Sequence, residues 1–415
     1  MLHVFLYNLV VNSYFLGIRA AAFWQEKARK WVAGRKGLFE ELEAAFVFQK
    51  TDPQPVVWFH CASLGEFEQG RTVIEQIKKE RPAIRILLTF FSPSGYEMRK
   101  NDPLADWVFY LPADSKANAL RFIQITRPTI AVFVKYEFWF HYLTELKFQQ
   151  IPTFLIAAVF RSNQPFFQWY GSLHRKMLHC FTMLFVQDET SINLLSTIGI
   201  MKFAMAGDPR IDRVLAMAGE GRQFPDITQF CGDNPVLVAG STWLKDEVLL
   251  FGLATSPVFK GWKMIIAPHD ISPKRIGEVL DQFGDRSVRH TGLTPETTAS
   301  VLIIDSIGKL AWLYQYGQVA YIGGGFGQGI HNTLEPMAFN LPVIYGPNHL
   351  KFVEAREMKQ RGGHFVVQSS QDLCQVLGQL SDPDHLSRSK RAISSYLHEN
   401  QGASRTIIRA VLEYL

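Results

Sequence analysis

Ser63-Leu64-Gly65-Glu66 is the first group of residues in this chain that could perform acid–base chemistry. It follows the apolar run 56–60, which is typical of a buried strand, and precedes the helical pattern over 64–79. A carboxylate in the first turn of a helix at the end of a strand can act as a general base. The spacing from Ser63 to Glu66 is also that of a capping box, in which both side chains serve only the helix start.

A glycine-rich segment over 321–329 is the second candidate, because its sequence YIGGGFGQG follows a strand pattern. Such a turn lets backbone N–H groups, among them those of Gly324 and Gly325, approach a phosphate at the positive end of a helix. The alternative is a flexible turn with no ligand. Neither a Walker loop nor the spacing G-x-G-x-x-G is present, which removes the main support for NAD binding.

The segment after this turn, His331-Asn332-Thr333-Leu334-Glu335, has the pattern of a helix start. Asn332 or Thr333 would cap the helix and face an anion, and Glu335 could accept hydrogen bonds from ribose hydroxyls. An ordinary helix cap is the alternative.

Three weaker groups also stand at the ends of apolar runs. Ser241 could contact a phosphate or sugar, although a plain helix cap fits it as well. His269 could meet a base or phosphate, but a lone histidine is more often structural. Glu137 and Arg161 could pair with each other across two strand ends, or could hold groups of an acceptor.

Length and composition indicate a globular chain of two domains. The chain has 415 residues, of which 47% are apolar and 20% charged. The net charge of +5 is concentrated near the N-terminus, which favours an anionic membrane surface over nucleic acid as partner. The four cysteines form no C-x-x-C, so we expect neither a zinc site nor a disulfide framework.

Short apolar runs alternate with helical patterns through most of the chain, which predicts parallel sheets of βαβ units. Glycines and prolines interrupt this pattern between about 206 and 235. We therefore expect an N-terminal segment 1–36, a first doubly wound domain over 37–210, a linker over 211–234 and a second such domain over 235–415. Two such domains would face a central cleft.

The N-terminal segment begins with an apolar run over 4–18, shorter than the roughly 20 residues that span a bilayer. Basic residues follow over 27–36, with Trp24 and Trp31 nearby. A cleavable signal peptide has its charge before the apolar run, so that interpretation fails. The remaining alternatives are a membrane anchor or interfacial helix, and a buried helix of the first domain.

Taken together, these residues resemble the Kdo transferase family, which adds 3-deoxy-D-manno-octulosonic acid (Kdo) to lipid A precursors. The motifs that carry the resemblance are Ser63–Glu66, Pro93–Gly95, Glu137–Trp139 and His331–Glu335. The resemblance extends from the N-terminal segment nearly to the C-terminus. It implies a GT-B fold with two Rossmann-like domains, the first for the lipid acceptor and the second for the donor CMP-Kdo. The last helix would pack back on the first domain.

The resemblance also implies roles for individual residues. Glu66 would be the catalytic base. Apart from the resemblance, the residues themselves make Ser63, Gly65, Glu137 and Arg161 candidates for acceptor contacts. Contacts with CMP would come from Pro268, His269, Ile307, Gly308, Lys309, Asn332, Thr333, Leu334 and Glu335. This chain departs from the family pattern twice, since the family often has arginine at the position of His269 and an acidic residue at that of Lys309.

The implied activity is an inverting transfer of Kdo from CMP-Kdo to a lipid A precursor (lipid IVA) at the cytoplasmic face of the inner membrane. No cluster of acidic residues in the sequence resembles a metal site, so we expect no required divalent ion, and we expect neither a cofactor nor nucleic acid as a partner. Two alternatives stay open on the residues alone. One is another nucleotide-sugar transferase or epimerase of the same fold, of the UDP-GlcNAc type, and the other is a non-catalytic, membrane-associated nucleotide-binding protein.

Overall fold

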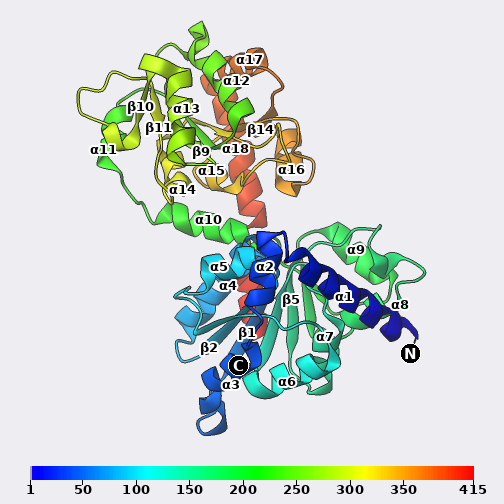
Figure 1. Ribbon diagram of the computed structural model, residues 1–415. Helices are drawn as coiled ribbons and strands as arrows, with labels where there is room; N and C mark the ends of the chain where they lie inside the picture. Colours follow the sequence, from blue (N-terminus) through cyan, green and yellow to red (C-terminus); the bar gives the residue numbers. More distant parts are fainter. Residues whose placement is uncertain (1) are drawn as a thin grey trace. The chain divides into compact units, whose positions relative to one another are not determined.

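The computed structural model describes residues 2–415 and divides into two compact units. Unit 1 comprises the chain up to Asp212 together with Gln401–Leu415, and unit 2 comprises Arg213–Asn400. Each unit is built on a seven-stranded sheet in which all paired strands run parallel (Figure 1). The expected α/β class is therefore confirmed.

The sheet of unit 1 has the strand order β3-β2-β1-β4-β5-β6-β7. Its strands are β1 (Val56–Cys61), β2 (Arg85–Phe90), β3 (Trp107–Tyr110), β4 (Ile130–Val134), β5 (Thr153–Ala158), β6 (Met183–Val186) and β7 (Phe203–Met205). Val57 pairs with Ile86 on one side and with Ile130 on the other, so β1 is central.

Helices cover both faces of this sheet, because its central strands are buried and mostly apolar. They are α1 (Leu2–Ala21), α2 (Glu26–Ala33), α3 (Leu38–Ala45), α4 (Leu64–Glu80), α5 (Pro93–Arg99), α6 (Lys116–Thr126), α7 (Phe140–Phe148), α8 (Ser172–Leu178), α9 (Glu189–Thr197) and α19 (Ala403–Leu412), with 3₁₀ turns η1 (Val47–Lys50) and η2 (Pro165–Phe167). Trp58 packs into the core on one face, and its neighbours Val57 and Phe59 pack into the core on the other.

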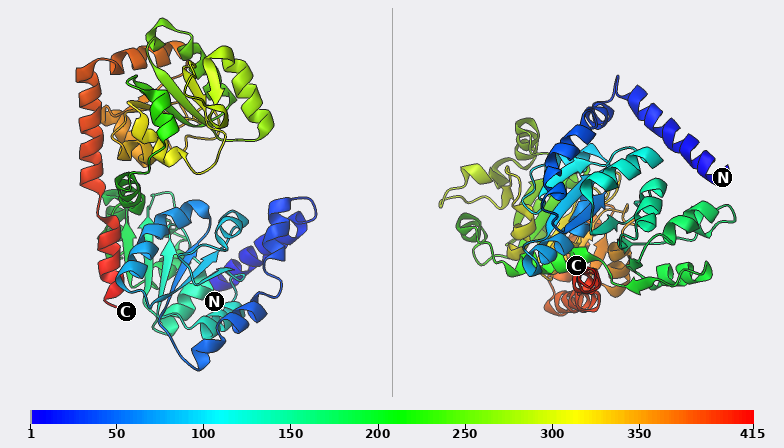
Figure 2. Two further views of the ribbon diagram at one scale, coloured as in Figure 1. Left: turned by 90° about the vertical axis from the view of Figure 1, so that its left-hand side faces the viewer. Right: turned by 90° about the horizontal axis from the view of Figure 1, so that it is seen from below.

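The C-terminal helix α19 belongs to unit 1, although the residues that precede it in sequence belong to unit 2. Ile407, Ile408 and Val411 are buried in the same core as α4, and Figure 2 shows this helix beside the first sheet. Asp212 fixes its start, because the carboxylate accepts the backbone N–H groups of Gly402 at 2.6 Å and Ser404 at 2.7 Å.

Unit 2 has the strand order β10-β11-β9-β8-β12-β13-β14. Its strands are β8 (Val236–Thr242), β9 (Lys263–Pro268), β10 (Ser287–Arg289), β11 (Val301–Ile303), β12 (Val319–Ile322), β13 (Val343–Tyr345) and β14 (His364–Val366). Its helices are α11 (Pro225–Cys231), α12 (Leu244–Ala254), α13 (Pro273–Phe283), α14 (Leu310–Leu313), α15 (Leu334–Ala338), α16 (Val353–Arg361), α17 (Ser370–Leu380) and α18 (Pro383–Asn400), with 3₁₀ turns η3 (Pro257–Phe259), η4 (Gly284–Arg286), η5 (His290–Gly292) and η6 (Tyr314–Tyr316).

Helical structure occupies much of the segment 211–234, for which the sequence suggested a linker. Helix α10 (Pro209–Gly219) crosses the boundary between the units, and α11 follows it.

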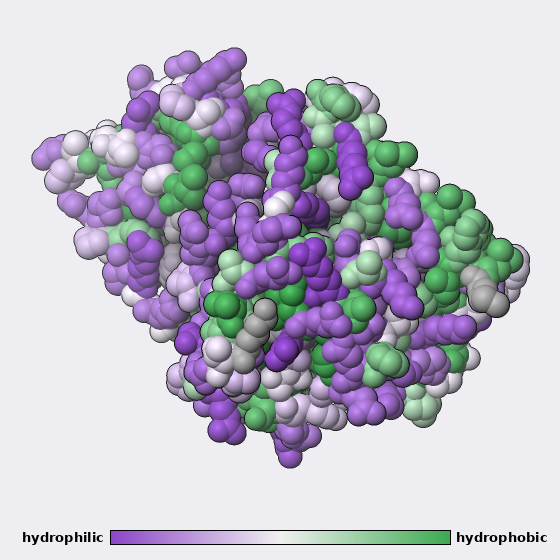
Figure 3. All heavy atoms as spheres, turned by 60° about the horizontal axis from the view of Figure 1, so that its bottom comes forward, coloured by the Kyte–Doolittle hydropathy of each residue, from purple (hydrophilic) through white to green (hydrophobic). Residues whose placement is uncertain are grey.

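The N-terminal helix α1 lies along unit 1 with one face against the protein. Val11 and Phe15 are buried beside Trp31, Phe91 and Trp139. Most of its other large apolar side chains are exposed, and Figure 3 shows hydrophobic atoms gathered on this side of unit 1. The exposed set is Leu2, Phe5, Leu6, Leu9, Val10, Tyr14 and Leu16.

Candidate active site

Several of the predicted site residues lie at the points where the strand order of each sheet reverses. In unit 1 this point is between β1 and β4, and in unit 2 it is between β8 and β12. Open α/β sheets bind ligands beyond the carboxyl ends of their strands at such points. The turns after β1 and β4 hold Glu66 and Glu137, and Ser241 and Gly324 stand at the ends of β8 and β12.

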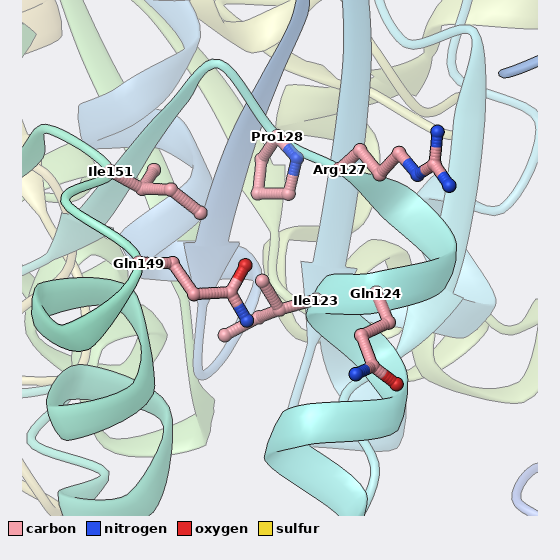
Figure 4. A pocket seen from close by; sticks show the side chains of 6 residues that line it. All are labelled: Ile123, Gln124, Arg127, Pro128, Gln149 and Ile151. Atoms are coloured by element: carbon pink, nitrogen blue, oxygen red, sulfur yellow. The ribbon is translucent and has the colours of Figure 1, made fainter.

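The opposite edge of the first sheet has a hollow that lacks comparable chemistry. It is lined by Ile123, Gln124, Arg127, Pro128, Gln149 and Ile151. In Figure 4 the side chains of Ile123 and Gln149 point toward one another, and Arg127 points away. Without a carboxylate or histidine, this hollow offers no acid or base, so the carboxyl edge is the candidate site.

Glu66 is in the first turn of α4, and its carboxylate turns back toward the strand. Its Oε2 accepts the backbone N–H of Ala62 at 2.5 Å. Ser63 is the N-cap residue, but its side chain makes no cap hydrogen bond, so the reciprocal capping box does not form. Gly65 is exposed, and a Cβ there would meet no protein atom within 4 Å, which leaves open space beside Glu66.

Burial, and after it the negative charge of Glu137, raise the pKa of Glu66 to about 8. The hydrogen bond from Ala62 and the charge of Lys135 oppose this rise. A carboxylate of this pKa holds a proton more strongly than an ordinary glutamate, which suits general base catalysis near neutral pH.

Glu137 is held by two ring N–H groups rather than by the arginine that we expected. His60 Nε2 is 2.8 Å from its Oε2, and Trp139 Nε1 donates to the same oxygen at 2.7 Å. The expected pair between Glu137 and Arg161 does not form within residues 2–415. Arg161 is exposed, and its backbone bonds Gln164: the Arg161 N–H donates to the Gln164 side chain, and its carbonyl accepts the Gln164 N–H.

Three non-glycine residues with left-handed backbone stand at carboxyl ends of strands in the two sheets. Lys135 follows β4 with φ 64°, Ala157 is near the end of β5 with φ 56°, and Ser241 is near the end of β8 with φ 53°. Such conformations cost free energy and cluster at functional sites. At these positions they redirect the chain, and the turn at Lys135 leads directly to Glu137.

The glycine-rich turn after β12 is packed tightly against neighbouring backbone. A Cβ on Gly323 would lie 2.2 Å from the Ser241 carbonyl oxygen, and one on Gly325 would lie 2.5 Å from the Gly346 nitrogen. Gly324 also has a φ of 90°. Close packing therefore requires these glycines, whether or not a phosphate binds the turn.

Asp246, in the first turn of α12, holds the glycine-rich turn after β12 in place. Its carboxylate accepts the backbone N–H groups of Trp243 and Gly324, each at 2.9 Å, and the hydroxyl of Tyr321 at 2.8 Å. Since Asp246 is buried, these three bonds replace the water that the charge loses.

A pocket of about 830 Å³ opens beside this turn in unit 2. Three rings stack along it: Trp243 on His269 with centroids 4.5 Å apart, and His269 on His331 at 4.7 Å. Trp243 Nε1 also donates to His331 Nε2 at 3.2 Å. His269, one of the expected donor contacts, thus lines a real pocket, with its neighbour Pro268 at the end of β9.

The helix start at α15 is capped by Asn332, not by Thr333. Asn332 Oδ1 accepts the N–H of Leu334 at 3.0 Å, and its Nδ2 donates to Glu335 Oε1 at 3.0 Å. Burial raises the pKa of Glu335, against the effects of Asn332 and Arg213. The Thr333 hydroxyl is buried without a hydrogen-bond partner.

The segment 305–312, which includes three expected donor contacts, also has unsatisfied polar groups. Asp305 Oδ1, Ser306 Oγ and Trp312 Nε1 are buried without partners. Buried polar atoms rarely stay unpaired, so these atoms and the Thr333 hydroxyl suit a bound ligand. Ile307 is 85% exposed, and Gly308 has a φ of 83°.

The Lys309 side chain contacts another part of unit 2. Its Nζ is 3.2 Å from His290 Nδ1, and His290 Nε2 is 2.8 Å from Asp226. Lys309, one of the two positions that depart from the family pattern, therefore makes a polar contact within unit 2. No group of three His, Cys, Asp or Glu side chains that could hold a metal ion occurs in the described part of the chain.

Sequence reasoning missed His60 and Asp246 as members of these sites. His60 is in the middle of an apolar strand, and only the pairing of β1 with β4 brings it to Glu137. In the sequence, Asp246 has the pattern of an ordinary helix-start residue, because Asp is common at helix starts. Neither residue had a distinguishing local pattern.

Comparison with known proteins gives one family for the first part of the chain. Residues 36–213 match the family described as 3-Deoxy-D-manno-octulosonic-acid transferase (kdotransferase). The 3-deoxy-D-manno-octulosonic acid transferase of Aquifex aeolicus is 27% identical over 331 residues, covering 78% of this chain and 85% of that protein. The transferase of Haemophilus influenzae is 28% identical over 380 residues, covering 88% of each chain.

Solved structures resemble the two units in fold. The UDP-GlcNAc 2-epimerase of Neisseria meningitidis has a TM-score of 0.60 at 18% identity, covering 86% of this chain and all (100%) of the epimerase. MurG of Acinetobacter baumannii has a TM-score of 0.54 at 10% identity, covering 87% of this chain and 100% of MurG. At these identities the likeness concerns the fold alone, which is GT-B-like.

Proposed function

This chain belongs to the Kdo transferase family of glycosyltransferases, and from that premise we propose that it transfers Kdo from CMP-Kdo to a lipid A precursor with inversion at the anomeric carbon. The observation that carries the proposal is Glu66, a partly buried carboxylate with a raised pKa at the reversal point of the first sheet. No described residue near it offers the acceptor another base of this kind.

The reaction requires one proton transfer and one substitution. Glu66 takes the proton from a hydroxyl of the acceptor, and that oxygen forms a bond with the anomeric carbon of Kdo. The bond between this carbon and the phosphate oxygen of CMP breaks, and CMP leaves with the electron pair. Glu66 is ionised before the step and neutral after it, so the charge gained by the departing phosphate balances the charge lost by the base.

The donor would occupy unit 2. The pocket at Trp243, His269 and His331 accommodates a sugar or phosphate, and the unpaired atoms of Asp305, Ser306 and Thr333 offer partners for a nucleoside. Glu335 would accept ribose hydroxyls, with Asn332 holding its carboxylate in place. The N–H groups of the glycine-rich turn would stabilise the leaving phosphate.

The acceptor is a lipid, and α1 would bring the protein to its membrane. Of the helices that the structure describes, α1 is the one long and apolar enough to cross a bilayer. We propose that it instead lies in the membrane surface, because its inner face is fastened along unit 1. Tyr7 donates to Asp114 at 2.6 Å, and His141 Nε2 is 2.7 Å from Asn8 Oδ1.

Some of the basic residues after α1 are exposed and would contact an anionic membrane surface. Lys27, Arg29 and Lys36 are exposed. Arg35 is not available to lipid in the same way, because its guanidinium donates to the carbonyls of Trp31, Phe91 and Leu111. The cytoplasmic face of the inner membrane is the location that this proposal implies.

One experiment tests the proposed function directly. The full chain is incubated with a lipid A precursor and CMP-Kdo generated in place, and the lipid products are weighed by mass spectrometry. We expect a mass increase of one or more Kdo units and inhibition by CMP. Inhibition by UDP in place of CMP, with no Kdo added, would favour a different nucleotide-sugar enzyme of this fold.

A further inference from the structure

A chain of hydrogen bonds runs through the buried interior of unit 1 and ends on Glu137. Trp58 Nε1 donates to Thr89 Oγ1 at 2.7 Å, and Thr89 Oγ1 is 2.9 Å from His60 Nδ1. His60 Nε2 is in turn 2.8 Å from Glu137 Oε2. His60 and Thr89 are completely buried, so no water competes for these bonds.

The Glu137 carboxylate sets the direction of the protons in this chain. It accepts the Trp139 ring N–H at 2.7 Å, so as an acceptor it places the ring proton of His60 on Nε2, 2.8 Å away, and leaves Nδ1 to accept. Trp139 Nε1 is also 3.2 Å from His60 Nε2, the longer of its two contacts. The Thr89 hydroxyl has one proton, which can go to His60 Nδ1 at 2.9 Å or to the Phe59 carbonyl at 3.3 Å. The shorter contact is the better hydrogen bond. If Thr89 donates to Nδ1, neutral His60 has its proton on Nε2 and donates it to Glu137.

Two ring N–H groups, from His60 and Trp139, then converge on one oxygen of Glu137. Donors of this kind favour the ionised form of a carboxylate. Glu137 stands two residues after the left-handed residue Lys135, so backbone and side chain both fix its position. Its charge acts on Glu66 and is one cause of the raised pKa there.

We infer that His60 is a positioning residue for the transfer reaction: its Nε2–H fixes the Glu137 carboxylate beside Glu66, and Thr89 sets the tautomer of the ring that does so. The inference rests on the proposed function, in which Glu66 is the base. The fixed negative charge makes Glu66 a stronger base than burial alone would. The other titratable groups near Glu66 are Lys135, Tyr136 and Cys61.

The test is the pH dependence of kcat/KM for Kdo transfer from CMP-Kdo to a lipid A precursor, measured with the full chain. In His60→Leu, the Glu137 carboxylate loses a hydrogen-bond donor and its fixed position, so its negative charge opposes the ionisation of Glu66 less strongly. We expect the acid limb of the profile to move to lower pH by about one unit. The rate on the plateau should fall about tenfold, because the base is weaker and less well placed.

Further variants keep the test decisive if His60→Leu folds poorly. Thr89→Val removes the hydroxyl that sets the tautomer and should move the acid limb in the same direction by a smaller amount. His60→Gln keeps an N–H donor and should restore part of the shift. The matched control is Thr126→Val, the same change at a buried threonine that bonds only the Phe122 carbonyl, and its profile should equal that of the wild type.

The outcomes separate this inference from the proposed function. A shift to higher pH in His60→Leu and Thr89→Val would show that His60 and Glu137 share an added proton and form a neutral pair, which overturns the inference. Unmoved acid limbs with lower melting temperatures would show that His60 is only structural, and overturn it as well. A wild-type protein that transfers no Kdo refutes the proposed function itself.

Discussion

Glu66 and Glu137, two carboxylates on neighbouring turns of the first sheet, are close enough for the charge of one to raise the pKa of the other. Each has its own fixed hydrogen-bond donors: the Ala62 backbone for Glu66, and the rings of His60 and Trp139 for Glu137. Two carboxyl groups in such different environments can have different roles, one as the base and the other as a fixed hydrogen-bond acceptor.

Glu66→Gln separates catalysis from helix capping. Glutamine keeps the size of the side chain and can still accept the Ala62 N–H, but it cannot take a proton from the acceptor. We expect turnover to fall by about 10²- to 10⁴-fold, the usual contribution of general base catalysis. CMP affinity, measured by calorimetry, should stay the same because Glu66 belongs to unit 1. Turnover near the wild-type level would refute the mechanism.

The pH dependence of the wild type follows from the same residue. Only ionised Glu66 can act as a base, so kcat/KM should rise with pH and reach half of its plateau near the pKa of Glu66, at about 8. Initial rates over a range of pH test this expectation. A plateau already reached at about pH 6 would show that another group is the base.

Stability should depend on pH through Glu66 in a defined direction. The pKa of Glu66 is higher in the folded state, at about 8, than the ordinary value of 4.5, so the folded state binds the proton more tightly. Its contribution to stability is complete below the ordinary value and is lost as the pH rises through about 8. The Glu66→Gln variant does not show this loss of stability, because glutamine does not ionise. The melting temperature of the variant relative to the wild type should therefore be higher at about pH 9 than at about pH 5.

Asn332→Ala and Glu335→Gln should weaken CMP binding. Asn332 caps α15 and orients Glu335, so either change removes a polar partner of the nucleotide site. Loss of a ligand hydrogen bond of this type costs about 1 to 3 kcal/mol, or roughly 5- to 150-fold in Kd. Calorimetric titration with CMP measures it, and binding of lipid vesicles is the control. Unchanged CMP affinity in both variants would move the nucleotide site elsewhere.

Membrane binding should depend on the outer face of α1 and not on its inner face. Phe5 is 65% exposed and Leu9 54% exposed, so Phe5→Asp with Leu9→Asp should reduce recovery with anionic vesicles while the melting temperature hardly changes. Removal of about the first 24 residues should also release the protein, with both sheets still folded. Tyr7→Phe is the control, since it loosens the inner face and keeps the outer one. Equal recovery of all these proteins with vesicles would exclude α1 as the membrane contact.

The sequence alone determined the two parallel sheets, because strands buried on both faces must be apolar along their whole length. It did not reveal the edge strands β7, β10 and β14, which have three residues each and are too short for a recognisable pattern. It also placed Glu66 and the glycine-rich turn at strand ends, since the order of strand, turn and helix is local information.

Only the tertiary structure decided what each of these residues contacts. The S-x-x-E spacing fits a capping box, yet Glu66 bonds Ala62, because the chain direction at the end of β1 brings that N–H to the carboxylate. Glu137 pairs with His60 instead of Arg161, because β1 and β4 are adjacent in the sheet although they are 77 residues apart at this pair. Such contacts depend on strand order, which the packing of the whole unit sets and no local pattern encodes.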